Sequence, residues 1–167
     1  MTRFVLLLLL LVPSIAQAEC IELIEFEIED QFKEKHRHDE LLGTTAVLVW
    51  ADRKGADFLD AWGDALDVAL EGHDVQRRAL AHVKGVPGWI PGLKGKIRGR
   101  FSEDPVEWAL LDWDGKFAKA YEPTEDTVNV LVFGPDGCYL GRVAGDEPDP
   151  VLIAALLERL PEPVSAE

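Results

Sequence analysis

The sequence predicts a mixed α/β domain with a central sheet covered by helices, and three observations predict it. Residues 45–50 form an apolar run rich in β-branched side chains, which is typical of a strand buried on both faces. Residues 56–70 place apolar side chains every four positions, which indicates an amphipathic helix. Residues 127–133 and 138–143 flank a Gly-Pro-Asp-Gly turn and predict a hairpin. Helix-linked strands followed by a hairpin require a mixed sheet.

The remaining segments fit the same architecture. We expect a half-buried strand at residues 21–28 and a charged loop at 32–42. Two short strands, at 79–83 and 108–112, are separated by a Gly- and Pro-rich stretch at 85–99. A short helix at 117–121 and a C-terminal helix at 151–160 complete the domain. Asp149 and Pro150 have the residue types of an N-cap and a first helical position.

The first 18 residues have the pattern of a secretory signal peptide. Arg3 precedes nine apolar residues at 4–12, and Ala16-Gln17-Ala18 supplies the small residues that a signal peptidase recognises. The apolar run is shorter than the roughly 20 residues that span a bilayer. We therefore predict a leader at 1–18, a domain at 19–161 and a frayed tail at 162–167. The mature chain has no predicted transmembrane segment and is predicted to be periplasmic or secreted, in an oxidising compartment.

Composition excludes several classes of function. The 167 residues carry 31 Asp and Glu against 17 Lys and Arg, a net charge of −14, which argues against non-specific binding of nucleic acid. Two cysteines are too few for a disulfide scaffold or a cysteine-only zinc site. The chain contains no Gly-rich phosphate loop, nucleophile elbow or His-Glu metal helix.

Three segments follow one another in order: an apolar strand at 47–51, a strand, turn and short helix at 109–121, and part of a hairpin at 130–137. In this order they resemble the thioredoxin-like superfamily, and within it the redoxin type of secreted bacterial protein. The resemblance implies that residues 47–51 form the central strand that delivers the redox site and that residues 130–137 belong to the late hairpin of the family. The resemblance covers about residues 21–160 and implies a three-layer sandwich with a mixed central sheet.

The same resemblance implies that a redox-active member carries two cysteines at positions 54 and 57. Lys54 and Asp57 stand there, and the position of the family's cis-proline aligns with Thr127 or Val128. Neither Lys nor Asp forms a thiolate or a disulfide, so we predict no dithiol activity, no catalytic residue and no cofactor. The residues expected along this vestigial edge are Trp50, Asp52, Arg53, Lys54, Gly55 and Asp57, with Val128 behind them.

Cations at a helix start are disfavoured by the helix dipole. Arg53 and Lys54 lie at the start of the predicted helix, so we expect a counter-anion there, either Asp57 or a ligand.

Cys20 and Cys138 are the only thiols, and four explanations compete: an internal disulfide, an intermolecular disulfide, a peroxidatic cysteine, or two inert residues. The resembled fold places the first strand and the last hairpin strand toward opposite edges, whereas a disulfide requires Cα atoms within about 7 Å. This argues against an internal bridge and favours Cys138 as a buried strand residue.

Residues 75–102 contain seven basic side chains and no Asp or Glu, on an otherwise acidic chain. Such segregation creates a local positive field. One interpretation is a docking patch for an anionic ligand or an unidentified protein, formed by Lys84, Trp89, Lys94, Lys96, Arg98 and Arg100. The alternative is a solvated helix face with a buried tryptophan.

The histidines favour no metal site. His36, His38 and Asp39 form a short cluster that His73 and His82 would have to complete, but four ligands must converge to hold structural zinc. A solvated loop of mixed charge explains the cluster more simply, and we predict no metal. The sequence thus favours a secreted binding module of the thioredoxin-like type. The alternative is a thiol-dependent oxidoreductase or peroxidase that uses relocated Cys20 or Cys138.

Overall fold

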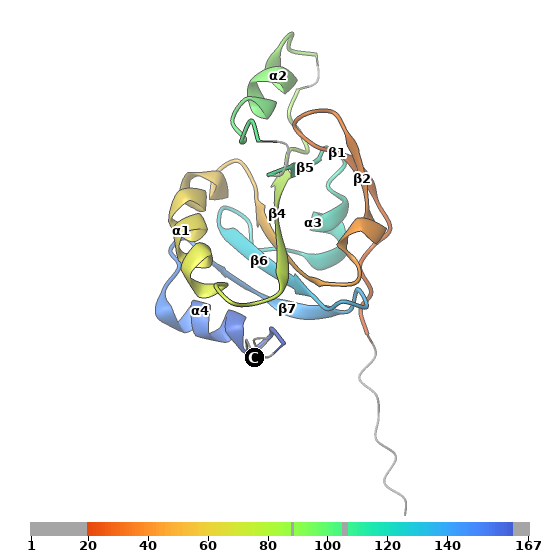
Figure 1. Ribbon diagram of the computed structural model, residues 1–167. Coiled ribbons are helices and arrows are strands. Elements are labelled where there is room, and N and C mark those ends of the chain that lie inside the picture. The colour runs from red at the N-terminus through yellow and green to blue at the C-terminus, as the bar shows by residue number, and fades with distance from the viewer. Residues whose placement is uncertain (1–19, 88, 105–106, 162–167) are drawn as a thin grey trace, which may run out of the picture.

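A computed structural model describes residues 20–87, 89–104 and 107–161, so the predicted leader and tail lie outside the described residues. Its centre is a five-stranded sheet in the order β5-β4-β3-β6-β7 (Figure 1). The elements, in chain order, are β1 Glu27–Glu29, β2 Lys35–Arg37, the 3₁₀ helix η1 His38–Leu41, β3 Thr45–Ala51, the 3₁₀ helix η2 Gly55–Phe58, α1 Leu59–Ala69, β4 Val75–His82, α2 Leu93–Arg98, β5 Ala109–Asp112, α3 Lys116–Tyr121, β6 Val128–Phe133, β7 Tyr139–Gly145 and α4 Pro150–Leu157.

The central strand is β3, and all seven of its residues are buried, as its apolar run predicts. It pairs in parallel with β4 and antiparallel with β6, which makes the sheet mixed. Because side chains alternate along a strand, Leu48 and Trp50 pack on the face covered by α3, whereas Val47 and Val49 pack on the face covered by α1 and α4 (Figure 1). The predicted three-layer α/β architecture is confirmed.

The predicted C-terminal helix begins as its sequence indicates. The side chain of Asp149 accepts hydrogen bonds from the amides of Val151 and Leu152, and Pro150 is the first residue of α4. No helix within the described ranges is both long enough and apolar enough to cross a bilayer.

The prediction for the N-terminal segment is wrong in extent. The expected alternation holds only from residue 24 to residue 28, where Phe26 and Ile28 are buried, and only Glu27–Glu29 forms a strand. This strand pairs with β2, inside the stretch predicted to be a loop, and the two strands form a separate small sheet. Pairing with β2, rather than the alternation by itself, decides which part of the segment becomes a strand.

Strand β4 begins at Val75, whereas the apolar pattern predicts a strand only from residue 79. The pattern misses the first half of the strand because that half carries arginines. Val75 pairs with Thr45 at the start of β3, so the parallel ladder extends over the basic residues Arg77 and Arg78. Their long aliphatic stems are half-buried, and the guanidinium of Arg77 pairs with Asp67 at 2.6 Å. Strands β3 and β4 therefore end side by side at the same end of the sheet. The segment with α2 projects beyond that end (Figure 1).

Candidate binding site at the carboxyl ends of β3 and β4

The carboxylate of Asp52 organises the loop that follows β3. One oxygen accepts hydrogen bonds from the amides of Lys54 and Gly55 at 3.0 and 2.8 Å. The other oxygen accepts from the amide of Asp126, at 2.8 Å, in the loop that precedes β6. A single side chain thus ties together two loops that are separated by more than 70 residues of chain.

These amides also set the charge state of Asp52. Partial burial alone would raise the pKa of the carboxyl group, but the donated hydrogen bonds from Asp126, Gly55 and Lys54 outweigh it, helped by the charge of His82. The pKa of Asp52 therefore lies below its usual value, and the group stays ionised at neutral pH.

The counter-anion of Lys54 is Asp126, which is neither of the two expected candidates, Asp57 or a ligand. The Lys54 ammonium lies 2.5 Å from the Asp126 carboxylate, and this hydrogen bond raises the pKa of Lys54. The side chain of Asp57 forms no ion pair or hydrogen bond with any residue in the described ranges. Asp126 lies 72 residues from Lys54 along the chain, which is why local spacing did not reveal the pair.

Gly55 brings the two loops into backbone contact. A β-carbon built on Gly55 would lie 2.2 Å from the carbonyl oxygen of Thr127, so only glycine fits there. Val128 is fully buried and pairs with Ala51, the last residue of β3. The buried amide of Asn129 fixes the same turn by exchanging hydrogen bonds with the backbone of Thr124.

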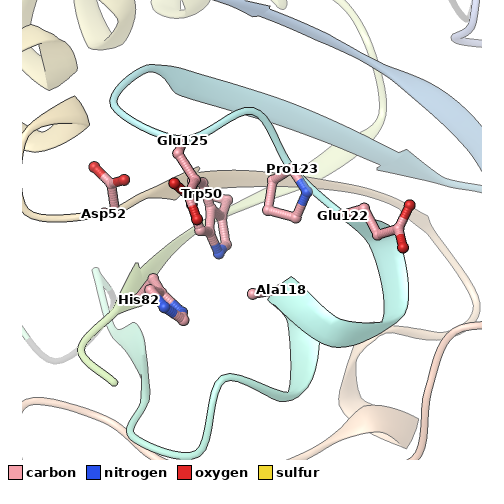
Figure 2. Close-up of a pocket in the computed structure, with 7 residues that line it drawn as sticks. All are labelled: Trp50, Asp52, His82, Ala118, Glu122, Pro123 and Glu125. Atoms are coloured by element: carbon pink, nitrogen blue, oxygen red, sulfur yellow. The ribbon is translucent and has the colours of Figure 1, made fainter. Parts of the chain in front are cut away.

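A pocket of about 260 Å³ opens beside this edge (Figure 2). Its floor is the indole of Trp50, which is 1% exposed, and the ring of His82 lies 5.5 Å from it, centre to centre. The lining residues come from the ends of β3 and β4, from α3 and from the loop before β6: Trp50, Asp52, His82, Ala118, Glu122, Pro123 and Glu125. The structure therefore brings Trp50 and Asp52, both predicted site residues, into a pocket.

Sequence reasoning missed the other polar members of this pocket. His82 is the last residue of β4, and Glu122 and Glu125 lie in an acidic loop before β6. In parallel sheets, ligands often bind at the carboxyl ends of neighbouring strands. His82, at the carboxyl end of the strand that pairs in parallel with β3, could therefore have been predicted as a site residue.

Cys20 and Cys138 are joined in a disulfide, with their Cα atoms 5.4 Å apart, and neither cysteine is free. Our argument against an internal bridge is wrong because residues 20–24 do not pass to the far edge of the sheet. They run beside the β6–β7 turn instead, where Glu22 bridges Cys138 and the amide of Leu23 donates to the carbonyl of Gly137 at 2.8 Å.

The disulfide lies at the opposite end of the sheet from Asp52. Strand β7 begins opposite Phe133, and Phe133 pairs with Ala46 near the start of β3. Asp52 follows the other end of β3. The two cysteine sulfur atoms are therefore separated from Asp52 by the length of the central strand.

The basic segment, residues 75–102, contains some cations that contact other side chains and some that form no ion pair within the described ranges. Arg98 pairs with Glu29 at 2.6 Å, and the Lys94 ammonium lies 4.6 Å from the centre of the Trp113 ring, so both fasten α2 to the body. Lys84, Lys96 and Arg100 form no side-chain hydrogen bond or ion pair within the described ranges. Trp89 is 82% exposed, so the alternative of a buried tryptophan is wrong.

The histidine cluster is built into the fold. The ring nitrogens of His36 lie 2.9 Å from Glu40 and 3.0 Å from buried Asp30, and the ring stacks on Trp108. His73 and His82 flank the two ends of β4 and cannot meet. Within the described ranges no group of three or more His, Cys, Asp or Glu is arranged to hold a metal ion.

Comparison with known proteins rests on structure alone, because no protein-family model and no curated protein sequence matches the chain. The solved structures that match include an exposed lipoprotein thioredoxin, Etrx1, of Streptococcus pneumoniae, with 17% identity and a TM-score of 0.61 over 82% of this chain and 100% of that one. The chain has the thioredoxin-like fold.

Two further solved structures are similar over most of the chain. MTB dsbF, solved in mixed oxidised and reduced forms, matches with 17% identity and a TM-score of 0.54 over 80% of this chain and 91% of that one. Arabidopsis thaliana ScoI, solved with copper bound, matches with 15% identity and a TM-score of 0.59 over 83% and 97%. Identities this low establish the fold, and activity has to be argued from the site.

Proposed function

We propose that this protein is an exported thioredoxin-like module that binds a partner and carries out no dithiol chemistry at the usual site of this fold. The observation that carries the proposal is the Lys54–Asp126 ion pair. Lys54 stands at one of the two positions where the superfamily carries cysteines, and hydrogen bonds to Asp52 hold the backbone of both partners in place. Asp57 occupies the other position. These side chains offer fixed charge and hydrogen bonds but no sulfur, so the edge suits recognition rather than electron transfer.

Export to the periplasm or the exterior is part of the proposal. The leader pattern of residues 1–18 and the Cys20–Cys138 disulfide support the same oxidising compartment.

The basic segment supports a protein partner with an acidic surface. Trp89 and Ile90 are exposed, and the free charges of Lys84, Lys96 and Arg100 lie on the same segment. An exposed aromatic side chain on a segment that carries unpaired cations suits an interface, because the aromatic side chain buries a large area while the charges steer association.

An insulin-reduction assay tests the absence of dithiol chemistry. The mature protein is compared with the double variant Lys54→Cys, Asp57→Cys, which restores two cysteines at the family's positions. We expect no reduction above the dithiothreitol background for the natural protein and a gain of activity for the variant. Reduction by the natural protein at a rate comparable to that of a thioredoxin would overturn the proposal.

The competing function is an oxidoreductase that uses Cys20 and Cys138. The observation in its favour is the exposure of Cys20, which leaves the disulfide open to attack by a thiolate. The double variant Cys20→Ser, Cys138→Ser separates the two functions. Loss of insulin or peroxide turnover in this variant, from a measurable rate in the natural protein and with the circular dichroism of the folded protein retained, would establish the competing function.

A pull-down with the mature protein tests the docking surface. The variant Lys84→Ser, Lys96→Ser, Arg100→Ser removes the free cations, whereas the control Lys116→Ser removes one cation from outside the segment. We expect partner recovery to fall in the first variant and in Trp89→Ala, and to persist in the control. Equal recovery in all four proteins would exclude this surface.

A further inference from the structure

The pocket beside the vestigial edge contains a buried hydrogen-bond donor without an acceptor. Trp50 is 1% exposed, and its indole Nε1 has no hydrogen-bond partner among the described residues. An indole N–H can only donate, so nothing but an acceptor can satisfy it. Figure 2 shows this nitrogen directed into the space between His82 and Ala118.

His82 repeats the same feature on the adjacent strand. Its Nδ1 atom is also buried and also without a partner among the described residues. By contrast, the indole of Trp62, on the other face of the sheet, donates to the carbonyl of Gly145 at 3.0 Å. Buried polar groups in proteins are nearly always paired, and an unpaired one is destabilising. Two unpaired nitrogens in the lining of one pocket therefore point to a bound group that supplies an acceptor for the Trp50 N–H and a polar partner for His82.

The charges around the pocket specify the rest of the ligand. Three carboxylates line it, and that of Asp52 is already engaged by three backbone amides. Glu122 and Glu125 form no side-chain hydrogen bond or ion pair within the described ranges, and the nearby ammonium of Lys54 is held by Asp126. The unpaired carboxylates of Glu122 and Glu125 therefore give the pocket a negative charge, which favours a cationic ligand.

We propose that this pocket binds a group that carries an ammonium or guanidinium cation beside a carbonyl oxygen, namely an arginine or lysine residue or the free amino acid. The carbonyl accepts from Trp50 Nε1, and the cation lies against Glu125, the glutamate beside Trp50 in Figure 2. The volume of about 260 Å³ lies just below the range of roughly 300–1,000 Å³ for pockets that hold drug-sized ligands, which suits one residue. This inference rests on the proposed binding function and names the chemistry that the site recognises.

The indole N–H resonance of Trp50 provides a direct test. The ¹⁵N-labelled mature protein is titrated with N-acetyl-arginine N-methylamide, which mimics a residue in a peptide, and separately with free L-arginine. The variant Trp50→Phe assigns the resonance, and the four other tryptophans serve as internal references. We expect a saturable downfield shift of the Trp50 signal, with the four references unmoved. A response to the blocked compound alone identifies a peptide ligand, and a response to free arginine alone identifies the amino acid.

Charge recognition is tested with an uncharged ligand and with glutamine variants. The citrulline analogue of the blocked compound keeps its shape and carbonyl but lacks the cation, and we expect it to bind about tenfold more weakly. The double variant Glu122→Gln, Glu125→Gln should weaken arginine binding by about the same factor. Glu71→Gln, an exposed glutamate at the other end of the sheet, is the matched control and should bind normally.

The inference is overturned if the Trp50 resonance does not move at millimolar ligand, or if citrulline and arginine bind equally well. Either result leaves the insulin-reduction assay unaffected, so failure of the ligand assignment is distinguishable from failure of the proposed non-redox function.

Discussion

Gly55 and Thr127 are in backbone contact, so close that a β-carbon on Gly55 would lie 2.2 Å from the Thr127 carbonyl oxygen. The contact joins the loop after β3 to the loop before β6, at the end of the sheet where the pocket opens. The Asp52 hydrogen bonds and the Lys54–Asp126 ion pair cross the same junction. The two loops therefore form one unit, and the predictions below test how that unit and the rest of the fold are held together.

Gly55→Ala should destabilise the protein because its methyl group would meet backbone atoms that cannot rotate away. We expect a loss of about 2–3 kcal/mol in the free energy of unfolding, measured by urea denaturation. Gly63→Ala is the matched control, since a β-carbon there meets nothing within 4 Å in the interior of α1. It should stabilise the helix by about 0.5–1 kcal/mol, and equal effects at the two sites would refute the close contact.

Asp52→Asn should weaken the junction, because an amide side chain presents one acceptor oxygen where the carboxylate presents two. We expect a loss of about 1–2 kcal/mol at pH 7. The folded pKa of Asp52 lies below its unfolded value, so its stabilisation is present above the unfolded pKa and is lost as the pH falls through the folded pKa. The variant and the natural protein should therefore converge in stability at low pH, and a constant difference from pH 7 to pH 2 would contradict this account.

Removal of the disulfide should be strongly destabilising because Cys20 and Cys138 are 118 residues apart. Closing a loop of that size restricts the unfolded chain, by about 4–5 kcal/mol in the chain-entropy model. We expect the double variant Cys20→Ser, Cys138→Ser to unfold at a lower urea concentration than the oxidised protein. Thiol titration of the unfolded, unreduced protein should detect no free cysteine, and two reactive thiols per chain would contradict the bridge.

His36→Gln should change the titration of Glu40. Partial burial raises the pKa of Glu40, but the hydrogen bonds from His36 and from the amide of Arg37 outweigh it, so the pKa lies below its usual value. Loss of the His36 contact should move the pKa of Glu40 upward, as measured by carboxyl ¹³C chemical shifts. Because a depressed carboxyl pKa stabilises the fold only above the unfolded value, the natural protein should also lose more stability than the variant as the pH falls.

His38→Gln is the control for this titration, because His38 makes no hydrogen bond to Glu40 among the described contacts. An unchanged pKa of Glu40 in His36→Gln would show that the contact with His36 is absent in solution.

Local sequence was enough to predict the elements that have strong periodicity or strong capping. The apolar run of β3, the four-residue repeat of α1 and the Asp149 cap of α4 were each predicted from a few neighbouring residues. Lys54 and Asp57, at the positions where the resemblance implies two cysteines, were likewise identified from the sequence alone, and the absence of dithiol chemistry stays a prediction.

The tertiary structure determined which residues that are distant in sequence come into contact. Cys20 reaches Cys138, Lys54 reaches Asp126, and His82 joins Trp50 and Glu125 around one pocket. None of these pairs has a local signature, because each depends on the paths that loops take between strands and on which strand ends lie at the same edge of the sheet. Periodicity encodes which face of an element is buried, whereas the contacts between loops are specified only once the whole sheet has assembled.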